Sequence, residues 1–194
     1  MAVVTPNIAP FINDTFWVTS PFWEVRGDRH HHGIDIAVPY DSQNQGIVYV
    51  YSMVEGKCID AGYSDGYGNY IILKQDSTNI GFLYAHLRIP DPQRLIDVGD
   101  IVHIGTACGY EGSTGQSTGP HLHLEIQQLY GPNYNWRHGD NIENFINPAV
   151  YMGIPNVEGT ECYYDGTPIF PPSKRKESAF PWVLYARKLR DMGR

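Results

Sequence analysis

Six of the eight histidines lie in three short groups along the chain, at residues 30–32, at residue 86, and at residues 121 and 123. In a β-strand, alternate side chains project to the same face, so His121 and His123 would lie about 6.5–7 Å apart on one side. One imidazole of such a pair could bind a metal while its neighbour faces the substrate or a water on that metal. An isolated H-x-H pair does not decide the chemistry, because cupins and carbonic anhydrases also use it and a purely structural role is as common.

The segment from His31 to Asp35 supplies the second half of such a site. Gly33 within it favours a turn or bulge over a helix, so His31 and Asp35 could converge on one point from two ends of a bend. With one histidine of the H-x-H pair they make a His/Asp/His set. Three protein ligands that leave a fourth position open are typical of catalytic zinc, which activates water and polarises a carbonyl for amide hydrolysis.

The histidine groups belong to an ordered set of motifs, which read HHGID at 31–35, YAHL at 84–87 and STGQSTGPHLHLEI at 113–126. Together they resemble the H-x-G-x-D, Y-x-H-[LM] and T-G-x-S-x-G-x-H-x-H-x-E motifs of the lysostaphin/LytM-type zinc endopeptidases of peptidoglycan, peptidase family M23. DGYGNYIIL at 65–73 is similar to the central GYGN strand of that family. The resemblance covers about residues 16–152, and chance agreement of three ordered motifs is remote.

Carried over position by position, the resemblance makes His31, Asp35 and His123 the ligands of a Zn2+ ion. It makes His86 and His121 the catalytic pair, which would orient and deprotonate the attacking water and hydrogen-bond the oxyanion. All five positions are filled, so the resemblance implies an active zinc metalloendopeptidase.

The resemblance also implies that Asn69 and Tyr84 contact the substrate. Both catalytic histidines must be at least partly neutral to act. Activity is therefore expected to fail below about pH 5–6, where imidazoles become charged and zinc leaves.

The elements that must position these residues are mostly strands. Glycine-rich and polar turn signals separate stretches in which β-branched and aromatic residues alternate, and no convincing helical stripe occurs before residue 140. We expect a mainly β fold, with an antiparallel β-sheet core of the LytM/M23 type and long loops. The resemblance also makes residues 20–26 an opening strand and residues 147–152 a closing strand. The alternating stretches are 46–59, 69–75, 80–87, 100–110 and 121–129.

The expected organisation is a lead-in at 1–15, a metallopeptidase domain at 16–152 and an irregular C-terminal extension at 153–194. Residues 130–146 are expected to be a loop insertion within the domain. The extension is rich in proline and glycine, and its last residues, 181–194, could form a short basic helix.

The composition narrows the class of partner. The net charge is −7, which disfavours a nucleic-acid binder. No run approaches ~18 apolar residues, so no membrane span is expected. Cys58, Cys108 and Cys162 are too scattered for a zinc knuckle or a disulfide framework, and we expect them to be small buried fillers.

The leading hypothesis is a zinc endopeptidase that cuts a stem-peptide cross-link or an interpeptide bridge of bacterial peptidoglycan. No secretory signal pattern is visible at the start, which favours a bacteriophage product. Such a product would act from the virion tail or after release outside the cell, for penetration or lysis of the host. The C-terminal extension could bind phage tail proteins.

Two alternatives stay open. One is a non-catalytic or occluded structural component of a phage tail that keeps the fold. The other is a cupin-like metal enzyme, in which His121 and His123 would both bind metal and Asp35 and His86 would have no role.

Overall fold

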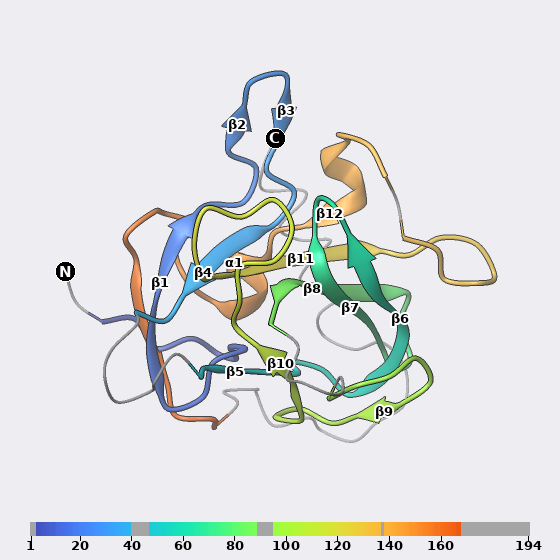
Figure 1. Ribbon diagram of the computed structural model, residues 1–194, viewed down its shortest axis with the longest axis horizontal. Coiled ribbons are helices and arrows are strands. Elements are labelled where there is room, and N and C mark those ends of the chain that lie inside the picture. The colour runs from blue at the N-terminus through green and yellow to red at the C-terminus, as the bar shows by residue number, and fades with distance from the viewer. Residues whose placement is uncertain (1–2, 40–46, 89–94, 137, 168–194) are drawn as a thin grey trace.

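The computed structural model describes residues 3–39, 47–88, 95–136 and 138–167 (Figure 1). Its centre is a nine-stranded antiparallel sheet, in which β12 (Phe145–Ile146) pairs with β11 beside the main path. Along that path the strands follow in the order β13 (Glu161–Tyr164), β1 (Asp14–Ser20), β4 (Ile34–Ala37), β11 (Leu122–Gln128), β8 (Ile80–Leu87), β7 (Gly68–Gln75), β6 (Gly56–Ser64) and β9 (Ile101–Val102).

Three of the predicted strands agree closely with the structure. Residues 69–75, 80–87 and 121–129 correspond to β7, β8 and β11. Each contains β-branched or aromatic residues that pack well on a pleated surface. The expectation of a mainly β fold with an antiparallel core is confirmed.

The stretches 46–59 and 100–110 each contain two strands rather than the single strand predicted. β5 (Tyr49–Tyr51) and β10 (Ala107–Tyr110) pair with each other in a small second sheet, whereas β6 and β9 belong to the main sheet. The chain turns between β5 and β6, where the Ser52 hydroxyl donates to the carbonyl two residues later at 2.8 Å. Because this turn keeps apolar residues on both sides, alternation alone did not reveal it.

Residues 147–152 form the helix α1 (Pro148–Met152) and not the closing strand that was expected. The Asn147 side chain accepts the backbone N–H two residues later, a proline opens the first turn, and Gly153 ends the helix with a φ of 74°. These start and stop signals dominate over the β-branched and aromatic residues between them. No helix in the described part of the chain is long and apolar enough to cross a membrane.

Residues 20–26 also do not form one opening strand. β1 ends at Ser20, and β2 (Val25–Arg26) pairs with β3 (Arg29–His30) in a hairpin that projects from the body of the molecule (Figure 1). Trp23 has a φ of 64°, and this left-handed residue turns the chain between the two elements.

The expected lead-in contributes to the core of the domain. Ile8, Ala9 and Phe11 are buried, and the ring of Phe11 lies 5.6 Å from that of Phe16 in β1. Part of the segment 1–15 therefore packs in the same core, and the bounds of the domain stay a prediction.

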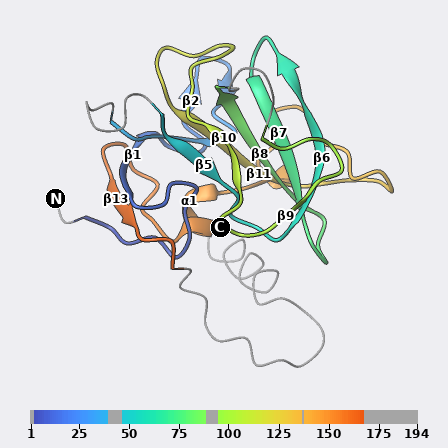
Figure 2. The ribbon, with the colours of Figure 1, turned by 60° about the horizontal axis from the view of Figure 1, so that its bottom comes forward.

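The first part of the expected C-terminal extension is also ordered into the sheet. β13 runs beside β1 and pairs with it from Asp14↔Tyr164 to Trp17↔Glu161 (Figure 2). Residues 161–164 are thus a strand, and the prediction of an irregular segment is wrong there. The predicted helix at 181–194 lies outside the described residues.

The three cysteines, at positions 58, 108 and 162, are buried in the main core and none forms a disulfide. Their predicted role as small buried fillers is confirmed.

β11 lies near the middle of the sheet, between β4 and β8. Leu122, Leu124 and Ile126 are fully buried in the main hydrophobic core, as their alternation predicted. Because strand side chains alternate, His123 and Glu125 project to the opposite face. The same strand therefore anchors the core and presents the polar site.

We predict that Phe11→Ala lowers the free energy of unfolding by about 3–5 kcal/mol, because it leaves a cavity beside Phe16. Val3→Ala is the matched control, since Val3 is 51% exposed and its loss should change stability by less than about 0.5 kcal/mol. Denaturant unfolding measures both. Equal stability of the two variants would contradict the inclusion of the N-terminal segment in the core.

Candidate metal and catalytic site

Three donor atoms meet where β4 and β11 run side by side. His31 Nε2 lies 3.0 Å from Asp35 Oδ1 and 2.9 Å from His123 Nδ1, and the two latter atoms are 2.7 Å apart. All three side chains are buried. Within the described ranges, they are the one group of His, Cys, Asp and Glu side chains that could hold a metal ion.

The sheet register and one glycine create this triangle. Asp35 in β4 lies directly opposite His123 in β11. A Cβ at Gly33 would lie 2.5 Å from the Leu124 carbonyl oxygen and 2.8 Å from His123 Cε1. Gly33 is therefore required by this close approach, and the chain bends there as the sequence predicted.

The outward nitrogens of the two histidines have acceptors that fix the tautomers. His31 Nδ1 lies 2.9 Å from the Pro21 carbonyl oxygen, and His123 Nε2 lies 2.9 Å from Glu125 Oε1. Each outward N–H donates, so in the neutral imidazoles the lone pairs of His31 Nε2 and His123 Nδ1 face Asp35. Such partners orient metal-binding histidines and increase their basicity.

Glu125 is itself held in place. It is 1% exposed and accepts a hydrogen bond from the Tyr67 hydroxyl at 2.9 Å. Burial raises the pKa of this carboxyl, but the hydrogen bond with His123, the charge of His123 and the hydrogen bond from Tyr67 together outweigh burial and leave the pKa below its usual value. The charged Glu125 therefore accepts the Nε2–H of His123 and orients the imidazole ring.

The triangle concentrates charge in a buried place. Burial raises the pKa of Asp35, but hydrogen bonds with His123 and His31 outweigh it and hold the pKa well below its usual range. For His123, burial lowers the pKa, while Asp35 and Glu125 raise it to a net value of about 9. Without a metal, His123 thus retains a proton at neutral pH, and a metal ion must displace it.

His86 reaches the site through an irregular backbone. Alternation along β8 would place it on the core face with Phe82 and Tyr84, but its φ is 60° and the pairing of β8 with β7 shifts register there. This left-handed residue is unusual for a non-glycine and costs energy, as is common at functional sites. His86 Nδ1 donates to the Thr114 carbonyl oxygen at 2.8 Å, which leaves the lone pair on Nε2.

His86 and His121, the catalytic pair that the resemblance implies, lie side by side. Their ring centroids are 4.7 Å apart, and His86 lies 5.7 Å from the ring of His123. His121 Nδ1 donates to the Gly119 carbonyl oxygen at 2.8 Å, and its Nε2 lies 3.7 Å from Asp35 Oδ1. Both lone pairs are therefore on Nε2, beside the donor triangle.

Burial lowers the pKa of His86 to about 4, against the opposing effect of its hydrogen bond to Thr114. His86 therefore stays neutral well below pH 7 and can accept a proton. Charging of His86 cannot cause the loss of activity expected at pH 5–6, so that loss must come from the other groups or from metal release.

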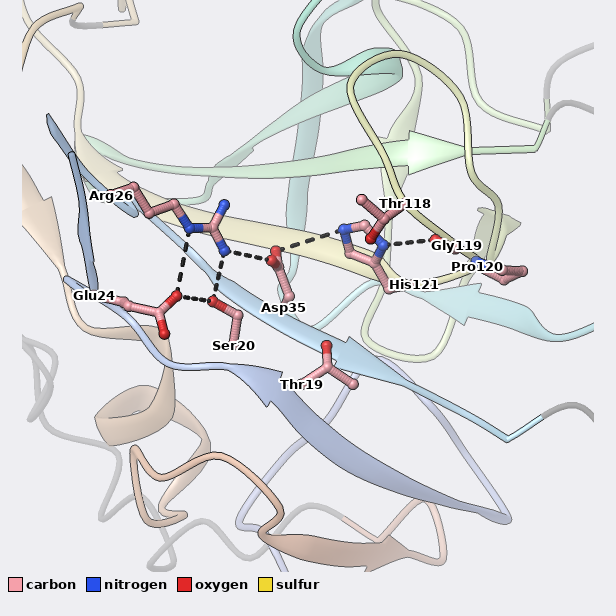
Figure 3. Close-up of a pocket in the computed structure, with 9 residues that line it drawn as sticks. All are labelled: Thr19, Ser20, Glu24, Arg26, Asp35, Thr118, Gly119, Pro120 and His121. Atoms are coloured by element: carbon pink, nitrogen blue, oxygen red, sulfur yellow. Dashed lines mark hydrogen bonds and ion pairs between the residues drawn. The ribbon is translucent and has the colours of Figure 1, made fainter.

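An open pocket lies beside Asp35 and His121 (Figure 3). It is formed by the end of β1, the hairpin β2–β3 and the glycine-rich loop before β11. Its lining is polar and includes one cationic side chain, Arg26. The lining residues are Thr19, Ser20, Glu24, Arg26, Asp35, Thr118, Gly119, Pro120 and His121.

The expected insertion at 130–146 contacts the residues on either side of His31. Asp140 lies 2.9 Å from both His30 Nδ1 and His32 Nε2. Trp23 stacks on His30 with ring centroids 4.7 Å apart. The two histidines that flank His31 therefore tie this segment to the hairpin and stay outside the donor triangle.

The two predicted substrate contacts differ in placement. Tyr84 is fully buried in the core, and its hydroxyl accepts the Met53 N–H at 3.0 Å, so the prediction that it contacts substrate is wrong. Its alternation on β8 points it away from the site. Asn69 is half-buried near the site loop, where its N–H donates to Thr114 Oγ1 at 2.9 Å. Substrate contact by Asn69 stays a prediction.

Sequence reasoning missed Arg26, Tyr67 and Asp140. Tyr67 lies in the GYGN segment, which was noted only as a strand. Arg26 lies in SPFWEVR, whose hairpin was not foreseen. Asp140 reaches His30 and His32 only through the tertiary fold, so no local pattern could have indicated it.

The family description "Peptidase family M23" matches residues 29–140, which include all five predicted metal-binding and catalytic residues. The chain therefore belongs to peptidase family M23. The expectation of a peptidase of this family is confirmed.

The chain is similar to one part of each of several longer curated proteins. The chain is 35% identical over 132 residues to an uncharacterized metalloprotease of Buchnera aphidicola, covering 68% of this chain and 27% of the relative. It is 33% identical over 96 residues to peptidoglycan DD-endopeptidase ShyB of Vibrio cholerae, covering 50% and 20%. Lysostaphin of Staphylococcus simulans is 34% identical over 96 residues, covering 49% and 17%. The chain thus spans about a quarter or less of the relatives' lengths.

Solved structures support the fold. The catalytic domain of lysostaphin from Staphylococcus simulans aligns with a TM-score of 0.52 and 25% identity, covering 73% of this chain and 92% of that domain. The catalytic domain of the prophage-encoded M23 protein EnpA from Enterococcus faecalis aligns with a TM-score of 0.53 and 28% identity, covering 74% and 97%.

The donor set fits the Zn2+ cofactor that was predicted. Two imidazole nitrogens and one carboxylate oxygen are ordinary zinc ligands, and three of them leave a position for water or substrate. The lone pairs already face one another, which is the arrangement that a cation requires.

We predict that zinc affinity rises with pH. Because the pKa of His123 is about 9, one proton competes with zinc at lower pH, so the dissociation constant should fall about tenfold per pH unit between roughly pH 6 and 8. Competition with a chromophoric chelator measures this. An affinity independent of pH in that range would contradict protonation of the metal-free site.

Proposed function

We propose that the chain is a zinc-dependent endopeptidase that hydrolyses a peptide bond of bacterial peptidoglycan. The observation that carries this is the convergence of His31 Nε2, Asp35 Oδ1 and His123 Nδ1, with two further histidines beside them. Membership of peptidase family M23 and the similarity to ShyB and lysostaphin support the substrate class.

His31, Asp35 and His123 would hold the zinc. When bound, Zn2+ supplies a Lewis acid that polarises the scissile carbonyl and lowers the pKa of water. Asp35 offers one negative charge, which leaves the loaded site with a net positive charge toward the substrate. Glu125 and the Pro21 carbonyl keep the two imidazoles in the correct tautomers.

His86 and His121 would carry the proton transfers. Their Nδ1–H groups are committed to backbone carbonyls, so Nε2 of each can accept a proton from the attacking water. In the protonated state the same nitrogens donate, and they can hydrogen-bond the oxyanion or protonate the leaving amine. The low pKa of His86 keeps it available as an acceptor at neutral pH.

The arrangement favours a peptidase over a cupin-like metal enzyme. A cupin-like site would use His121 and His123 together and would not need Asp35. Here Asp35 Oδ1 is one of the three donor atoms of the triangle, whereas His121 Nε2 lies 3.7 Å from Asp35 Oδ1 and the ring of His121 lies beside that of His86.

We also propose a bacteriophage origin, with action from the virion tail or after release at the cell wall. The similarity to prophage-encoded EnpA supports this origin. Phage tail proteins that bind the C-terminal extension are part of the same proposal. An occluded or non-catalytic tail component is the alternative, and the next experiment separates it from the enzyme.

The test is release of new amino groups from purified peptidoglycan by the zinc-loaded chain. We expect release by wild type, loss with a chelator, and a decrease of about 10²–10⁴-fold in His121→Ala, which should still bind one zinc. His103→Ala is the control, because its side chain is 76% exposed and contacts Glu55 outside the site.

Two outcomes would contradict the proposal. Zinc-loaded protein that releases nothing from several wall types would favour the occluded or structural role. Full activity of His121→Ala would refute the proposed proton-transfer pair.

A further inference from the structure

Arg26 reaches from the hairpin β2–β3 to the donor triangle. Its Nη2 donates to Ser20 Oγ at 2.6 Å and to Asp35 Oδ2 at 3.1 Å, and its Nε lies 3.4 Å from Glu24 Oε2 (Figure 3). The side chain is nevertheless 48% exposed in the open pocket. Arg26 therefore contacts both a predicted zinc ligand and the space where a peptide would lie.

The first consequence concerns Asp35. Its Oδ1 faces the two histidines, while Arg26 engages its Oδ2. The guanidinium thus holds the carboxylate in an orientation that offers one oxygen to the triangle. Arg26 is a positioning residue for Asp35.

The second consequence concerns the exposed part of the guanidinium. Nη1 has no hydrogen-bond or ion-pair partner among the described residues, and Figure 3 shows it pointing away from Glu24 and Ser20. The contact with the half-exposed Glu24 is long and offsets little of the charge. When a metal shares the charge of Asp35, Arg26 is left with spare positive charge and unused donors.

The other residues that line the pocket make Arg26 the one place where an anionic group of the substrate would be attracted. Arg26 is its one cationic side chain, and Glu24 and Asp35 are its anionic ones. An anionic group on the substrate would be repelled elsewhere in the pocket and attracted at Arg26. The Nη1 N–H groups of Arg26 can donate to a carboxylate oxygen, and the charge of the guanidinium strengthens that hydrogen bond.

We propose that Arg26 binds a carboxylate of the peptide substrate close to the bond that is cut. This inference rests on the proposed peptidase function and deepens it, because it distinguishes between the two kinds of bond considered. Stem peptides carry carboxylates on side chains and at the free end, whereas a glycyl bridge carries none along its length. The preferred substrate is therefore a stem-peptide cross-link.

The test compares matched synthetic peptides with the zinc-loaded full chain. One is a cross-linked stem-peptide dimer with free carboxylates, and two others have either the side-chain or the terminal carboxylates converted to carboxamides. An oligoglycine peptide with an amidated C-terminus, which carries no carboxylate, completes the set. We expect wild type to prefer the free-carboxylate dimer by about 10- to 100-fold in kcat/KM, and the amidation that removes the preference identifies which carboxylate is bound.

Arg26→Gln should reduce kcat/KM for the free-carboxylate dimer and remove the preference over its amidated forms. Arg29→Gln is the matched control, since it removes the same side chain from the same hairpin at a position that is 79% exposed. Zinc content and zinc affinity are measured for each variant, which reports the effect on Asp35 separately. Arg26→Lys keeps the charge without the Nη1 donors and should retain part of the preference, so it carries the test if Arg26→Gln loses zinc.

The outcomes separate this inference from the proposed function. Equal losses on free and amidated peptides in Arg26→Gln, with the preference unchanged, would leave Arg26 with a positioning role only and overturn carboxylate binding. Wild type that cuts intact peptidoglycan but treats all peptides alike would overturn the inference and leave the function standing. No cleavage of peptidoglycan or any peptide would overturn both.

Discussion

Three lone pairs that point at one another are the constraint on which this structure depends. The Nδ1–H of His31 donates to the Pro21 carbonyl, and the Nε2–H of His123 donates to Glu125. The other ring nitrogens, His31 Nε2 and His123 Nδ1, nevertheless lie within 3.0 Å of each other and of Asp35 Oδ1. Because these three atoms are buried, their lone pairs repel one another unless a cation lies between them. A proton on His123 can serve without a metal, and a divalent ion satisfies all three atoms together.

The fold provides what this arrangement requires. The apolar residues of β11 pack in the core and so fix the position of His123 on the opposite face of the strand. The register with β4 then places Asp35 opposite His123. Gly33 allows β11 to approach the segment that carries His31. The strained backbone at His86 then turns a residue from the core face to the site. Hydrophobic burial thus stabilises an arrangement that charge repulsion alone would open.

Much of the site was predictable because short motifs fix residue types at fixed spacing. Alternation located β7, β8 and β11, and the motif register identified His31 within the triple histidine. Alternation alone fails on β8, because it would place His86 with Tyr84 in the core, and a bulge leaves no mark in residue type. The cap signals around 147–152 were present but were outweighed by a family resemblance to a strand.

The contacts that lie between elements could not be predicted. Arg26 reaches Asp35 only because the hairpin folds toward the pocket, and Asp140 reaches His30 only because the chain returns after β11. These contacts depend on turn geometry and on packing over long sequence separation.

X-ray absorption at the zinc edge of the loaded protein tests the central claim most directly. The account predicts one zinc with two imidazole nitrogens and one carboxylate oxygen at about 2.0–2.2 Å, with any remaining ligand a light atom from solvent. It also predicts that Asp35→Asn changes this spectrum and that His121→Ala leaves the protein ligands unchanged. A zinc bound by three imidazoles, or a spectrum insensitive to Asp35→Asn, would contradict it.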